Sequence, residues 1–116
     1  MEVKKYIQDN EARFMDELFS LIRIPSISAL PQHKDDMIAC AERWKELLLE
    51  AGADKAEVMP SAGNPLVYAE KHVSDDAPTV LIYAHYDVMP AEPLELWKSN
   101  PFEPEIRDGR IWARGA

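Results

Sequence analysis

A histidine and an aspartate two residues apart, His85 and Asp87, follow the unbroken apolar run at residues 80–84. Such a run of β-branched and aromatic residues is typical of a strand buried on both faces of a sheet. In open α/β sheets, ligands bind in the crevice at the carboxyl ends of these strands. A carboxylate bonded to one imidazole nitrogen fixes the tautomer and orientation of a metal-ligating histidine. The spacing therefore predicts a metal ligand, His85, oriented by Asp87, although an ordinary polar residue closing the core would give the same pattern.

One histidine is too few for a catalytic zinc site, which uses about three protein ligands and keeps one position open. The other two histidines are not predicted to be ligands, since His33 lies in a proline-bounded loop and His72 at the polar end of another predicted strand. The adjacent acids Asp75 and Asp76 come shortly before Pro78, which predicts a solvated turn. The remaining ligands must come from elsewhere.

A specific series of motifs surrounds and follows this histidine. In order, they are His-Tyr-Asp-Val-Met-Pro at residues 85–90, Trp97 with Pro101-Phe102 after it, Arg-Asp-Gly-Arg at 107–110, and Arg-Gly-Ala at 114–116. Residues 79–116 resemble the co-catalytic zinc aminopeptidase-like metallopeptidases, a family that includes aminoacylases, glutamate carboxypeptidases and succinyl-diaminopimelate desuccinylases. Within that family, the nearest branch resembles the carnosinase-like dipeptidases.

The resemblance implies that His85 binds one of two zinc ions and that Asp87 belongs to the catalytic machinery as the group that orients it. The implied reaction is hydrolysis of the amide bond of a dipeptide or a related small N-acyl amino acid. Ala84 stands where many relatives have glycine, and Met89 occupies a variable place; both departures leave the ligand role intact. Arg114 either braces the metal loop or is an exposed arginine.

The resemblance also implies that these residues are the N-terminal part of a longer enzyme. In the family, an aspartate that bridges both metals follows the Arg-Gly-Ala motif almost at once, whereas this sequence stops at Ala116. The general base, the remaining metal ligands, the substrate-selecting residues and a lid domain that mediates homodimerisation would lie beyond. We therefore expect two zinc ions in the parent enzyme, and neither a stoichiometric zinc ion nor activity in these 116 residues alone.

Composition excludes several classes of function. The formal net charge of −8 disfavours binding to nucleic acid, because phosphates would repel the chain. The lone Cys40 excludes a disulfide framework, and its place on an apolar helix face indicates a core residue rather than a nucleophile. No run of about 18 apolar residues or signal core is present, which predicts a cytoplasmic protein that does not span a membrane.

Periodicity predicts a helix over residues 3–22, whose core-facing side chains are Val3, Ile7, Phe14, Leu18 and either Leu21 or Ile22. A second helix is predicted over residues 34–51, ended by Gly52, and its apolar stripe consists of Met37, Cys40, Ala41, Trp44, Leu47, Leu48 and Ala51. Between them, the serines of residues 24–28 are interpreted as turn formers. Strands are predicted at 57–59, 66–71 and 79–84, and a hairpin over 105–107 and 110–113 around Asp108-Gly109. The expected fold class is α/β: residues 1–116 as the N-terminal portion of a zinc-exopeptidase-like catalytic domain, two helices followed by mixed-sheet strands and a hairpin.

A second hypothesis is a noncatalytic binding or assembly module. In that interpretation, the aromatic-rich turn from Trp97 to Phe102 packs against a partner instead of supporting a catalytic domain. The presence of further acidic metal ligands in the parent gene would separate the two hypotheses.

Overall fold

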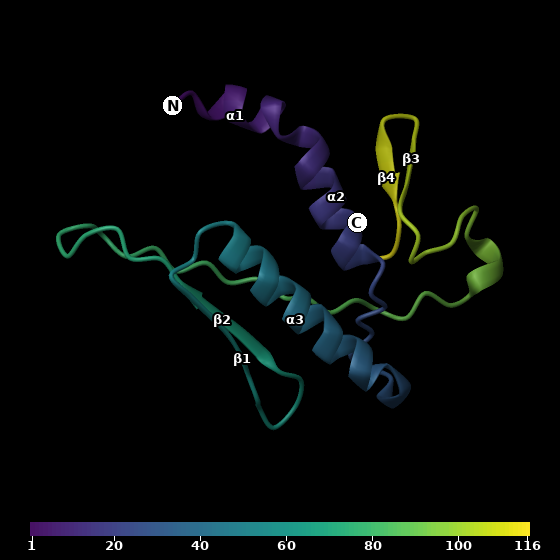
Figure 1. Ribbon diagram of the computed structural model, residues 1–116. Helices are drawn as coiled ribbons and strands as arrows, with labels where there is room; N and C mark the ends of the chain where they lie inside the picture. Colours follow the sequence, from purple (N-terminus) through teal and green to yellow (C-terminus); the bar gives the residue numbers. More distant parts are fainter. The chain divides into compact units, whose positions relative to one another are not determined.

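The computed structural model describes all residues from Met1 to Ala116 and divides into two units (Figure 1). Unit 1 comprises Met1–Ile24 and Ala91–Ala116, and unit 2 comprises Pro25–Pro90. None of the helices has the length and apolar character needed to cross a membrane.

Unit 2 is built on helix α3 (Lys34–Glu50), which follows the short 3-10 turn η1 (Pro31–His33). The helix packs against an antiparallel hairpin of strands β1 (Lys55–Met59) and β2 (Leu66–Glu70), as Figure 1 shows. Its buried side chains recur at helical spacing and are Met37, Cys40, Ala41 and Leu47. The predicted second helix and its apolar stripe are therefore confirmed in the main, although Ala51 at the end of the stripe is exposed.

The end of α3 is set by Gly52, as the sequence predicts. Gly52 has a φ of 101°, a left-handed conformation that glycine adopts more readily than other residues. The Ala53 N–H donates to the Leu48 carbonyl and the Gly52 N–H to the Leu49 carbonyl, each over 3.0 Å. This pair of bonds is the Schellman motif, which satisfies carbonyl groups that the helix leaves unpaired.

The predicted strand at residues 79–84 is wrong, because this segment has no hydrogen-bonded strand beside it. Its apolar side chains are exposed, with Leu81 at 90% and Tyr83 at 87%. The predicted mixed sheet is wrong for the same reason, since the four strands form two separate antiparallel pairs. An apolar run signals a preference for burial, but a sheet forms only where a partner strand can complete the ladder. The one nearby bridge is parallel and joins Ile27 to Val88.

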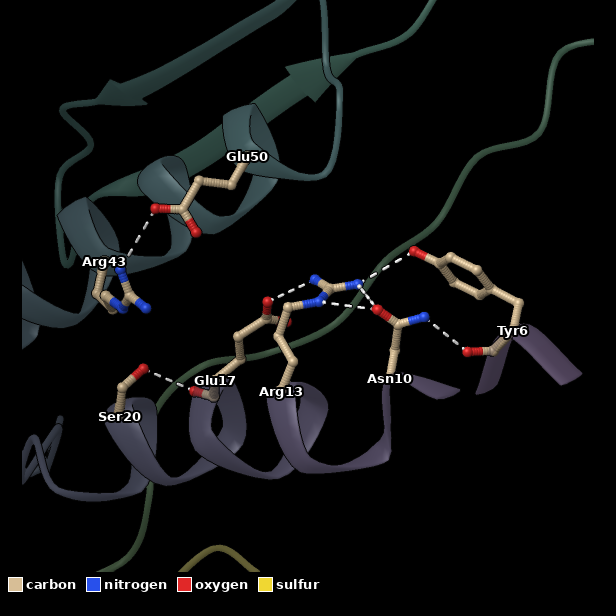
Figure 2. A network of polar contacts seen from close by, with 7 residues as sticks. All are labelled: Tyr6, Asn10, Arg13, Glu17, Ser20, Arg43 and Glu50. Carbon is tan, nitrogen blue, oxygen red and sulfur yellow. Dashed lines mark hydrogen bonds and ion pairs between the residues drawn. The ribbon is translucent and has the colours of Figure 1, made fainter. Parts of the chain in front are cut away.

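Unit 1 begins with two helices, α1 (Val3–Asp9) and α2 (Glu11–Ile22), where the sequence predicts one. The break is at Asn10, whose side-chain Nδ2 donates to the Tyr6 carbonyl over 2.8 Å (Figure 2). Asparagine competes in this way with regular helical bonding. The predicted core cover is confirmed only at Ile22, because α1 buries no residue and α2 buries no other.

The C-terminal part of unit 1 holds the turn η2 (Leu94–Leu96) and a hairpin of β3 (Glu105–Arg107) and β4 (Arg110–Trp112). Asp108 and Gly109 have φ of 52° and 69°, as a two-residue type I′ turn requires, so the predicted hairpin is confirmed.

Trp97 and Arg114 are held together within unit 1. The indole Nε1 of Trp97 donates to the Ala91 carbonyl over 2.8 Å. The guanidinium carbon of Arg114 lies 5.2 Å from the centre of the Trp97 ring. Arg114 is half-buried, so its interpretation as an exposed arginine is wrong. The Trp97 ring is half-buried and is covered in part by this contact. The second hypothesis, in which this turn packs against a partner, stays a prediction.

Replacing Gly52 by alanine is predicted to lower the free energy of unfolding of unit 2 by about 1 kcal/mol. No heavy atom lies within 4 Å of the added Cβ, so the cost comes from the left-handed backbone rather than from a clash. Gly63→Ala is the matched control, because Gly63 also faces open space but lacks a positive φ. Urea unfolding followed by circular dichroism measures the stability of both variants. Equal unfolding midpoints for Gly52→Ala and Gly63→Ala would contradict the prediction.

Candidate metal centre

The imidazole of His85 is held by Asp87, as the sequence predicts. The Nδ1 atom lies 3.0 Å from Asp87 Oδ1 and 3.1 Å from the Asp87 carbonyl oxygen. Both neighbours accept hydrogen bonds when the carboxyl is ionised, so Nδ1 carries the proton of the neutral ring and Nε2 keeps a lone pair. The His85 side chain is 79% exposed. The arrangement therefore presents one imidazole nitrogen in the form that can ligate a metal.

Asp87 is in turn held by Ser28, whose place in the sequence predicts only a turn former. The Ser28 hydroxyl donates to Asp87 Oδ2 over 2.5 Å. This hydrogen bond is the main cause of the lowered pKa of Asp87. Partial burial of the carboxyl acts to raise that pKa, and the hydrogen bond with His85 acts to lower it. Asp87 is consequently ionised at neutral pH and can accept from both neighbours.

The segment that carries Ser28 is fixed to the chain around His85 by backbone contacts. The Val88 N–H donates to the Ser26 carbonyl over 2.9 Å, next to the parallel bridge between Ile27 and Val88. The Ser26 hydroxyl donates to the Tyr86 carbonyl over 2.9 Å. Ser26 and Ile27 are 2% and 3% exposed, so these contacts lie in the interior of unit 2. No local signal in the sequence could reveal them, because the partners are about sixty residues apart.

Helix α3 supports the same turn from its buried face. The Cys40 thiol donates to the Tyr86 carbonyl over 3.8 Å, and the Tyr86 hydroxyl donates to the Pro65 carbonyl over 2.6 Å. Burial raises the pKa of the Cys40 thiol, and a hydrogen bond with Ser26 opposes this only in part. Cys40 is therefore a core residue, as the sequence predicts.

The other histidines pair with nearby acids. His33 Nδ1 lies 2.8 Å from Asp36 Oδ2, and His72 Nε2 lies 3.2 Å from Asp75 Oδ1. The Asp75 side chain is 99% exposed, in agreement with the predicted solvated turn. No group of three or more His, Cys, Asp or Glu side chains in the chain could hold a metal ion. The donor chemistry of His85 and Asp87 thus fits one ligand of a metal site together with its orienting carboxylate.

Comparisons with known proteins identify relatives of this chain. Residues 81–116 match the family described as Peptidase family M20/M25/M40. A cysteinylglycine-S-conjugate dipeptidase from Corynebacterium striatum is 36% identical over 107 residues, which cover 92% of this chain and 24% of that protein. The matched segment therefore contains both His85 and Asp87.

Two solved structures share the fold of the chain. Human carnosine dipeptidase 1 superposes with a TM-score of 0.84 at 26% identity, over 97% of this chain and 26% of that one. The M20 family metallo-carboxypeptidase Sso-CP2 from Sulfolobus solfataricus superposes with a TM-score of 0.73 at 42% identity, over 85% and 22%. The chain is thus a small α/β piece that spans about a quarter of the length of these relatives.

Cys40 is predicted to react with Ellman's reagent at least about tenfold more slowly in the folded chain than in urea, because the thiol is buried and its pKa is raised. The matched control is a Cys40→Ala, Ser61→Cys double variant, which moves the single thiol to an exposed loop. Equal rates for the two folded chains would contradict the burial of Cys40.

Proposed function

This chain belongs to the M20 peptidase family, and we propose that the whole protein hydrolyses the amide bond of a dipeptide or a related small N-acyl amino acid with the help of bound zinc. The observation that carries the proposal is the pairing of His85 with Asp87, which leaves Nε2 of an exposed imidazole ready to ligate. The family typically binds metal, and we propose two zinc ions for the whole protein.

Within this chain, His85 is the residue that would hold a zinc ion, through Nε2. Asp87 would keep the ring in the required tautomer and orientation, because its Oδ1 accepts the Nδ1 proton. When bound, the metal would supply a hydroxide at neutral pH and a positive charge that polarises the scissile carbonyl. The general base and the remaining ligands are assigned to other parts of the whole protein.

The names of the relatives support the proposed class of substrate. The Corynebacterium protein is a dipeptidase for cysteinylglycine S-conjugates, and the human structure is a carnosine dipeptidase. The Sulfolobus structure is a carboxypeptidase, so hydrolysis of a peptide bond is common to the three. We favour a dipeptide because the alignment with the Corynebacterium dipeptidase covers nearly the whole chain.

The proposed partners follow from the same assignment. A small peptide would be the substrate, and nucleic acid is disfavoured by the net charge of −8. A cytoplasmic location and a homodimer formed through a lid domain complete the proposal for the whole protein.

In the whole protein, His85→Ala is predicted to abolish most zinc binding, because it removes a metal–nitrogen bond. Asp87→Ala is predicted to lower metal affinity or activity by about 10- to 100-fold, because the imidazole loses its orienting partner. Zinc content by mass spectrometry and dipeptide hydrolysis in zinc-limited buffer measure both effects. His72→Ala is the matched control, since His72 is an exposed histidine paired with an acid outside the site. Full activity of the His85 or Asp87 variant would refute the assigned roles.

The 116-residue chain by itself is predicted to show no stoichiometric zinc site of about micromolar or better affinity and no dipeptidase activity. His85 supplies one nitrogen, while both carboxylate oxygens of Asp87 already accept hydrogen bonds. Isothermal titration calorimetry with zinc, together with a dipeptide assay, tests this. A tight one-to-one site with turnover would mean that other side chains converge on His85.

A further inference from the structure

We propose that Ser28 is a positioning residue for the candidate metal ligand: by donating to Asp87 Oδ2, its hydroxyl fixes the carboxylate so that Oδ1 holds the Nδ1 proton of His85. The three side chains thus form a relay, Ser28 to Asp87 to His85. Only the consequence for metal binding rests on the proposed function, because the effect on the imidazole is independent of it.

The relay is needed because two of its members, Asp87 and His85, face water. The side chains of His85 and Asp87 are 79% and 41% exposed, so solvent competes for both of their hydrogen bonds. A carboxylate held at one oxygen can still rotate about its terminal torsion, which is broad and roughly two-fold. A second bond at Oδ2, 2.5 Å from the Ser28 hydroxyl, restricts that rotation and keeps Oδ1 toward the ring.

Ser28 can act as an anchor because the backbone before it is immobilised. Ile27 is buried and bridges to Val88, and the Ser26 carbonyl accepts the Val88 N–H. The two serines have different targets. Ser26 donates to the main chain at Tyr86 and holds the turn, whereas Ser28 donates to the side chain that orients the imidazole.

The ring tautomer of His85 provides the direct test, read from the ring nitrogen shifts in ¹⁵N NMR at about pH 8, where an ordinary imidazole is neutral. In the metal-free 116-residue chain, we expect mainly the Nδ1–H form. Ser28→Ala should raise the population of the Nε2–H form, while Ser28→Thr, which keeps a hydroxyl, should restore the original spectrum. Ser61→Ala is the control, because it removes an exposed hydroxyl that bonds only within its own loop.

A variant of similar size guards against loss of folding in Ser28→Ala. Ser28→Cys retains the shape of the side chain but offers only a weak donor, so it should also shift the tautomer. An unchanged tautomer in Ser28→Cys, with the amide spectrum of the folded chain, would overturn the proposal. So would an unchanged tautomer in folded Ser28→Ala.

The consequence for metal binding is measured separately in the whole protein. We expect Ser28→Ala to weaken zinc affinity by about tenfold, measured by competition with a chelator, and Ser28→Thr to restore it. A tautomer shift without any hydrolase activity in the whole protein would uphold the positioning role and refute the proposed function. Hydrolase activity in the whole protein, together with an unchanged tautomer in folded Ser28→Ala, would uphold the proposed function and refute the positioning role.

Discussion

The pairing of residues 26–28 with residues 86–88 is the contact on which the candidate site depends. It consists of the bridge between Ile27 and Val88, the hydrogen bond from Val88 N–H to the Ser26 carbonyl, and the two serine hydroxyl bonds. Residues 80–84, just before His85, have no such pairing and are exposed. A buried contact between distant segments therefore gives an exposed histidine a defined orientation.

The pairing is stabilised by the core of unit 2. Cys40, on the buried face of α3, contacts the Tyr86 carbonyl, and Tyr86 reaches the Pro65 carbonyl through its hydroxyl. The Tyr86 carbonyl accordingly accepts from both Cys40 and Ser26. Polar groups in an interior must find partners, so these bonds also satisfy groups that burial would otherwise leave costly.

Features encoded by neighbouring residues could be predicted from the sequence. Gly52 ends α3, Asp108-Gly109 closes the hairpin, and the spacing of His85 and Asp87 brings them into contact. Features that depend on distant partners could not. The run at residues 80–84 has every local preference of a strand but lacks a neighbour, and the role of Ser28 depends on a residue 59 positions later.

The three residues from His85 to Asp87 also constrain how this part of the chain can change. The side chains of His85 and Asp87 contact each other, whereas the hydroxyl of Tyr86, the residue between them, donates to the Pro65 carbonyl. This is the alternation of sides that successive residues show in a strand. The solvent-facing pair and the inward-facing anchor are thus adjacent in a single tripeptide. Insertion or deletion of one residue here would exchange the two sides, turning a charged carboxylate toward the core and the tyrosine toward water. The spacing of this tripeptide is consequently less free to vary than the identity of exposed neighbours such as Met89.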